Sequence, residues 1–145
     1  MPDSLRVQAL KVLARREYSR AELRAKLAPH AESEEQLDSL LDALQAERLL
    51  SDQRYANQRV IARAGRFGNS RLKQELRTHG VGDEDIAAAM EESGGDETER
   101  CRAVWNKKFG HPPASAEERA KQMRFLQYRG FSADAIRRVL KGEEE

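Results

Sequence analysis

The chain has 145 residues, of which 39% are hydrophobic and 35% charged, and its net charge is only +1. This lean apolar content argues against one thick core and favours helices that each bury a single stripe of side chains. No run approaches the roughly 20 apolar residues of a membrane span, no secretory signal pattern begins the chain, and the single cysteine cannot form an internal disulfide. A cytoplasmic protein is therefore expected.

Helix-forming residues dominate the sequence, and no convincing run of alternating β-branched residues predicts a strand. Capping signals and glycine or proline stops divide the chain into predicted helices. They cover residues 4–16, 20–29, 34–48, 52–64, 70–79, 84–92, 96–109, 116–129 and 133–141.

Two kinds of helix start are expected. In a capping box, a serine and a side chain three residues later satisfy two backbone amides reciprocally. The sequence predicts such boxes for Ser19 with Glu22, Ser33 with Gln36, and Ser115 with Glu118. Asp83 and Ser132 are predicted to cap their helices alone.

The pattern of apolar and small residues recurs along the chain. The first copy comprises Leu23, Leu27, Ala31, Ser33, Leu37 and Leu41, and the second Leu72, Leu76, Gly80, Gly82, Ile86 and Met90. The third comprises Gln122, Leu126, Gly130, Ser132, Ile136 and Leu140, so Gln122 replaces a leucine. Tyr18 and Phe67 also match, whereas Glu117 stands at the corresponding third position.

This periodicity predicts an all-α fold, an elongated and curved array of three tandem three-helix repeats. The predicted repeats are residues 1–50, 51–94 and 95–145, the last with an acidic tail. The small residue at 31, 80 and 130 is expected at a turn that closes a helix, where a positive φ is common.

The charge is segregated along the chain. Residues 54–80 hold seven basic residues against one acid, a net of +6, and residues 83–99 hold eight acids and no Lys or Arg. Residues 100–141 hold eleven basic residues against three acids, a net of +8, and the tail Glu143, Glu144, Glu145 is acidic again. Two basic segments around an acidic one indicate a functional surface, with a solvated face and local ion pairs as the alternative for any one stripe.

Arg59, Arg63 and Arg66 are spaced at i, i+4 and i+7, which predicts a shared helix face. Such stripes suit phosphates or an acidic protein surface. The candidate binding residues are Arg59, Arg63, Arg66, Arg71, Lys73 and Arg77 in the second repeat, and Lys107, Lys108, Lys121, Arg124 and Arg129 in the third. The near-neutral total argues against a protein whose main task is gripping bare nucleic acid.

No constellation of residues predicts catalysis, a metal site or a cofactor. His30, His79 and His111 lie far apart, without the spacing of local zinc motifs. Cys101 lies on a predicted helix four residues before Trp105 and is expected to be a buried small hydrophobic residue. The chain is therefore not expected to be an enzyme.

Four segments, in order along nearly the whole chain, resemble the RecX family of recombination regulators. They are Arg16 to Leu23, Ser51 to Ala56, Leu72 to Arg77 with Gly80 and Val81, and Tyr128 to Phe131. The resemblance implies a three-repeat helical protein of DNA repair, recombination and the SOS response. Such a protein binds the RecA recombinase, lies in the groove of its filament on single-stranded DNA, and restrains strand exchange, ATP hydrolysis and co-protease function.

The expected partner is thus the RecA nucleoprotein filament, with single- or double-stranded DNA as a further ligand, and the default oligomeric state is a monomer. The alternative is a DNA-binding regulator in which residues 70–92 act as a helix-turn-helix. Against that alternative, Asp83, Glu84 and Asp85 at the start of its recognition helix would repel phosphates.

Overall fold

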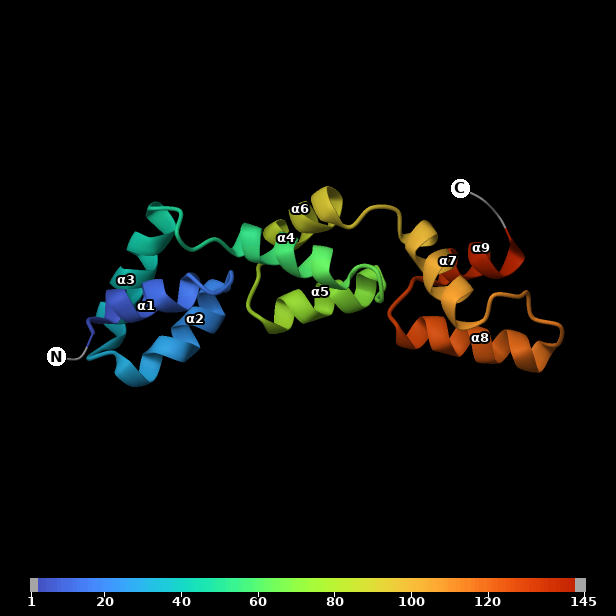
Figure 1. The fold of residues 1–145 in the computed structure, drawn as a ribbon, viewed down its shortest axis with the longest axis horizontal. Helices are drawn as coiled ribbons and strands as arrows, with labels where there is room; N and C mark the ends of the chain where they lie inside the picture. The colour runs from blue at the N-terminus through green and yellow to red at the C-terminus, as the bar shows by residue number, and fades with distance from the viewer. Residues whose placement is uncertain (1–2, 143–145) are drawn as a thin grey trace.

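The computed structural model describes residues 3–142 and folds them into helices joined by turns (Figure 1). These residues contain no strand. The helices are α1 (Leu5–Leu13), α2 (Arg20–Leu27), the 3₁₀ helix η1 (Ala28–His30), α3 (Glu34–Ala46), α4 (Asp52–Arg63), α5 (Asn69–Thr78), α6 (Asp83–Ser93), α7 (Glu97–Lys108), α8 (Ala116–Tyr128) and α9 (Ala133–Lys141). The predicted acidic tail, Glu143 to Glu145, lies outside the described residues.

The predicted caps at Ser19 and Ser132 are confirmed. The Ser19 hydroxyl accepts a hydrogen bond from the Glu22 amide, and the Glu22 carboxylate accepts one from the Ser19 amide, which completes the capping box. At α9 the Ser132 hydroxyl accepts a hydrogen bond from the Ala135 amide. Both serines satisfy amides that the first helical turn would otherwise leave unpaired.

The other two predicted capping boxes close on a different amide. Ser33 and Ser115 do cap α3 and α8. The side chains of Gln36 and Glu118, however, accept from the amide of the residue before the cap, at 2.6 and 2.7 Å. The φ angles of these two caps are −158° and −148°, against −74° at Ser19, so their own amides are rotated away from the returning side chain.

The prediction that Asp83 caps α6 is wrong. Gly82 is the cap, with an extended backbone at φ −74° and ψ 159°, and Asp83 is the first helical residue. Gly82 has no side-chain oxygen, so no side chain caps this helix. The carboxylates of Asp83, Glu84 and Asp85 in the first turn interact favourably with the helix dipole instead.

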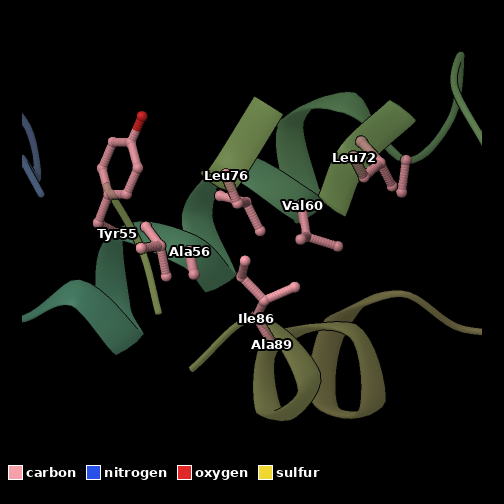
Figure 2. Packing of buried hydrophobic residues seen from close by; sticks show 9 residues of the cluster. Tyr55, Ala56, Val60, Leu72, Leu76, Ile86 and Ala89 are labelled. Atoms are coloured by element: carbon pink, nitrogen blue, oxygen red, sulfur yellow. The ribbon is translucent and has the colours of Figure 1, made fainter. Parts of the chain in front are cut away.

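Each consecutive group of three helices encloses its own hydrophobic core. In the middle group, α4, α5 and α6 converge on Val60, Leu72, Leu76 and Ile86, all at most 2% exposed (Figure 2). The first group is centred on Leu23, Leu27, Leu37, Leu41 and Leu44, and the third on Cys101, Leu126, Phe131 and Ile136. The groups follow one another along the long axis of the molecule, so the fold is an elongated all-α array of three-helix repeats (Figure 1). We call α1–α3, α4–α6 and α7–α9 repeats one, two and three.

The small residues that close the second helix of each repeat behave in two ways. Gly80 and Gly130 adopt the expected positive φ, at 85° and 91°. Ala31 does not, because its φ is −83° and α2 continues into η1, which has Pro29 at its start. The first repeat therefore ends its second helix without the left-handed turn of the other two.

The two junctions between repeats use equivalent positions. At the first, the Ser19 hydroxyl donates to the carbonyl of His79 at 2.7 Å. At the second, the amide of Gly68 donates to the carbonyl of Arg129 at 2.8 Å. Positions 19 and 68 are 49 residues apart and positions 79 and 129 are 50 apart, which is the period of the sequence repeat. One mode of docking thus joins repeat one to two and repeat two to three.

The third repeat accommodates its glutamine at a leucine position. Gln122 is 2% exposed. Its side-chain oxygen accepts a hydrogen bond from the indole N–H of Trp105 at 2.8 Å, and its side-chain nitrogen donates to the carbonyl of His111 at 3.2 Å. The amide therefore satisfies the tryptophan donor and also holds the loop between α7 and α8.

Candidate partner-binding surface

Three of the predicted arginines in repeat two converge on one carboxylate. Arg63 makes two hydrogen bonds to Glu75, of 2.6 and 2.9 Å, while Arg59 and Arg71 each lie 3.6 Å from it. Burial raises the pKa of Glu75, but the hydrogen bond from Arg63 and the charges of all three arginines outweigh burial and hold that pKa below 4.5. The carboxylate stays ionised at neutral pH and offsets one of three positive charges.

Four of the predicted arginines surround a single aromatic ring. The guanidinium carbons of Arg63 and Arg71 lie 4.5 and 4.6 Å from the centre of Phe67, and those of Arg66 and Arg129 lie at 5.4 and 5.5 Å. Arg129 follows α8 and the other residues belong to repeat two, so the ring gathers cations across the junction. We call Phe67 and these four arginines the Phe67 cluster.

The helix face predicted for Arg59, Arg63 and Arg66 explains only part of the Phe67 cluster. Because α4 ends at Arg63, Arg66 lies in the turn after the helix rather than on its face with Arg59 and Arg63. Its backbone carbonyl accepts a hydrogen bond from the guanidinium of Arg129 at 3.0 Å. The junction between repeats, rather than helical periodicity, brings Arg66 into the cluster.

A hollow of about 440 Å³ adjoins the Phe67 cluster and shares Arg66 and Arg129 with it. Ala103, Val104 and Phe125 supply apolar wall, and Lys107 and Lys108 supply two further cations. No acid is among the described residues that line it. We call this the second junction hollow, and its chemistry suits an anionic group beside an apolar one.

The remaining predicted binding residues lie outside the Phe67 cluster and the second junction hollow. Arg77 is 3.4 Å from Asp83 in an exposed ion pair, which stabilises little. Lys73 has no polar partner within the described part of the chain. Lys121 and Arg124 lie on α8 at i and i+3, on the exposed face that ends at Tyr128.

Tyr128, Phe67 and Phe125 were not among the predicted site residues. Tyr128 is 75% exposed, and the guanidinium of Arg71 lies 5.6 Å from its ring centre. Lys108 and Arg129 lie 5.3 and 4.9 Å from the centre of Phe125. The sequence carried two signals, because Phe67 matches Tyr18 in the repeat and Tyr128 begins the fourth segment that resembles the RecX family. The match of Phe67 to Tyr18 extends to the structure, where Arg16 lies 3.5 Å from the centre of the Tyr18 ring.

Not every cation at the junction is free to meet a partner. Arg100 donates to the carbonyls of Ala64 and Phe67 at 3.1 and 2.7 Å, and also to the side-chain oxygen of Asn69. Burial lowers the pKa of Arg100, although Glu97 and Asp96 raise it in part. This arginine of α7 ties repeat three to the turn between α4 and α5, and its role is structural.

Side chains that could act as a nucleophile or bind a metal ion are either buried or too far apart. Cys101 is fully buried, and burial raises its pKa to about 12, so it carries almost no thiolate at neutral pH. Among residues 3–142, no three His, Cys, Asp or Glu side chains gather closely enough to hold a metal ion. No helix in the same range is long and apolar enough to cross a membrane.

Known proteins match this chain over nearly its full length. The family models described as the second and third three-helix domains of RecX match residues 51–90 and 95–140. The regulatory protein RecX of Ralstonia pickettii is 49% identical over 144 residues, which cover 99% of this chain and 91% of that protein. The regulatory protein RecX of Neisseria gonorrhoeae is 43% identical over 138 residues, covering 95% and 90%.

The chain belongs to the RecX family. A crystal structure of RecX from Lactobacillus salivarius has a TM-score of 0.80 at 20% identity, over 95% of this chain and 93% of that one. A crystal structure of a second regulatory protein RecX has a TM-score of 0.74 at 21% identity, over 96% and 74%. These RecX structures share the fold of tandem three-helix repeats.

Proposed function

We propose that this RecX family member binds the RecA recombinase filament on single-stranded DNA and modulates its recombinase, ATPase and co-protease activities. The observation that carries the proposal is the gathering of cations from two repeats at the Phe67 cluster and the second junction hollow. The surface lies on a molecule three repeats long, so it can engage a partner that is itself extended.

A protein filament on DNA offers a repeated series of acidic groups, from its subunits and from the phosphates. An elongated array can touch several of them at once, and modest contributions at separate points then add. Exposed cations such as Lys107 and Lys108 also accelerate association with an acidic partner, and salt weakens that effect.

The alternative function, a helix-turn-helix regulator of duplex DNA, would use α5 and α6. The first turn of α6 carries Asp83, Glu84 and Asp85, and the Asp83 side chain is 88% exposed. A recognition helix enters the major groove by its N-terminal residues, where these carboxylates would face phosphates. The acidic start of α6 therefore favours the RecA filament as the partner.

The experiment follows ATP hydrolysis by RecA on single-stranded DNA with increasing amounts of the chain. We expect suppression at substoichiometric amounts. The double variant Lys107→Glu/Lys108→Glu reverses two exposed charges at the second junction hollow, and we expect it to need at least about tenfold more protein.

A matched control is Lys26→Glu/Lys141→Glu. These lysines are also exposed and also lie in the last turns of helices, so net charge and helix-dipole effects change equally. The control should inhibit like the unmodified chain. No effect of the unmodified chain on RecA would refute the proposal, and sequence-specific binding to duplex DNA would favour the alternative.

A further inference from the structure

Another hollow lies at the junction between repeats one and two, which is the first junction along the chain. Its volume is about 490 Å³, and Arg15, Arg16 and Arg59 are its cations. The other lining residues are Leu13, Ala14, Glu17, Tyr55 and Gln58. We call it the first junction hollow.

The two hollows occupy equivalent positions in the repeat. Adding the 49-residue period to positions 16, 17, 55, 58 and 59 gives 65, 66, 104, 107 and 108, and all five line the second junction hollow. The equivalence follows from the shared docking mode of the junctions. The array thus carries the same kind of cationic recess twice, one repeat apart.

Helix α4 runs from one hollow to the other. Gln58 lines the first and Gly65, just beyond the helix end, lines the second. Ile61 and Ala62 lie between them at the i+3 and i+4 spacing that keeps residues on one helix face. Ile61 is 65% exposed, and Ala62 is exposed as well. An apolar strip therefore connects two cationic recesses.

The rings near the hollows are covered by the chain's own cations. Tyr18 has Arg16 over its face, Phe67 has its four arginines, and Phe125 has Lys108 and Arg129. A nucleic acid base would have to displace these cations to stack on the rings, and stacking is how single strands are usually held. The exposed ring of Tyr128 lies outside both hollows. The exposed Ile61 between the hollows offers an apolar contact, which suits an apolar side chain better than a phosphate backbone. Both features favour a protein ligand.

We propose that the two junction hollows and the Ile61 strip form one docking face for a protein segment with an apolar side chain between two acidic ones. The apolar side chain packs on Ile61, and the carboxylates meet the cations of the two hollows. From Gln58 to Gly65 the helix rises by about 10 Å, so a segment of a few residues spans the face. The proposal rests on the proposed function, because the segment would belong to the RecA filament rather than to its DNA.

The test compares Ile61→Ser with Val7→Ser. The second variant removes another exposed apolar side chain, which lies on α1 outside both hollows and is 39% exposed against 65% for Ile61. Two probes are used: RecA filaments on poly(dT), and fluorescein-labelled poly(dT) alone. We expect Ile61→Ser to weaken filament binding about tenfold without changing binding to poly(dT), and Val7→Ser to change neither. Circular dichroism checks that both variants remain folded.

A second pair of variants tests whether one segment occupies both hollows. Arg15→Glu alters the first and Lys108→Glu the second. Each should lower filament affinity without lowering the number of chains bound at saturation.

If the unmodified chain binds filaments but Ile61→Ser binds equally well, the docking face is refuted while the proposed function stands. Weaker binding of Arg15→Glu and Lys108→Glu to poly(dT) alone would make nucleic acid the occupant, and no filament binding by the unmodified chain would refute both proposals.

Discussion

Gln122 shows how one side chain can break a repeat pattern and still serve the core. The sequence registers it only as a departure from leucine, because periodicity reports polarity and not hydrogen-bond partners. In the structure its side-chain oxygen accepts from the Trp105 indole, and its side-chain nitrogen donates to the His111 carbonyl. The change from leucine to glutamine at this position therefore supplies an acceptor for the indole N–H of Trp105, seventeen residues away along the chain.

Replacing Gln122 by leucine should restore the pattern yet destabilise the protein. The indole donor and the loop carbonyl would lose their partner, at a cost of about 1–3 kcal/mol. Urea unfolding followed by the fluorescence of Trp105, the single tryptophan, would measure the loss. Gln127→Leu on the exposed side of α8 is the control, and equal stability of the two variants would contradict the assignment.

Glu75→Gln should reduce stability at neutral pH by about 1 kcal/mol, because three arginines lose their shared anion. The folded pKa of Glu75 lies below 4.5, so its stabilisation is present above that pH and is lost as the pH falls through the lower folded value. Urea midpoints of the variant and the unmodified chain should therefore converge in acid. A difference that persists once Glu75 is protonated would show that the carboxylate acts through packing rather than charge.

At the scale of the element, helix positions follow from local signals. Caps and glycine stops predicted α9 at residues 133–141, as observed, and α4 to within one residue. The largest miss is α1, predicted to reach residue 16, which ends at Leu13. The residues beyond it are drawn into the first junction, where Glu17 pairs with Arg54 at 2.8 Å, and such a tertiary contact has no local signature.

The junctions place strict demands on single residues of the connecting turns. A Cβ at Gly68 would lie 2.3 Å from the backbone of Gly130 and Phe131, where neither chain can yield easily. Gly68→Ala should therefore destabilise the protein by about 1–3 kcal/mol. Gly65→Ala is the control, because nothing lies within 4 Å of a Cβ there. Urea unfolding would distinguish them, and equal midpoints would mean that the second junction is looser than described.

At the scale of the whole molecule, three small cores in a line replace one large core. A compact domain of this length has a radius of gyration of about 15 Å. Small-angle X-ray scattering should give a clearly larger value, independent of protein concentration for a monomer. A value near that of a compact domain would mean that the repeats fold back on one another in solution.

The surface could be predicted from the sequence only in part. Charge counting selected Arg63, Arg66, Arg71 and Arg129, which the structure does bring around Phe67. Counting included Glu75 as the one acid of residues 54–80 but could not show that it lies against Arg59, Arg63 and Arg71. It also could not separate these residues from Lys121 and Arg124, because the selection depends on contacts between segments about 60 residues apart.

The hydrogen bonds between Gly68 and Arg129 and between Ser70 and Gly130 join main-chain atoms alone. These two bonds of the second junction do not depend on which side chains cover the surrounding surface, whereas the Ser19 hydroxyl and the Arg100 guanidinium are the side chains that the junctions require. The distance between repeats two and three can thus stay constant while exposed residues are replaced. Charged and apolar groups on the exterior are free to adapt to a changing partner without altering the distance at which they are presented.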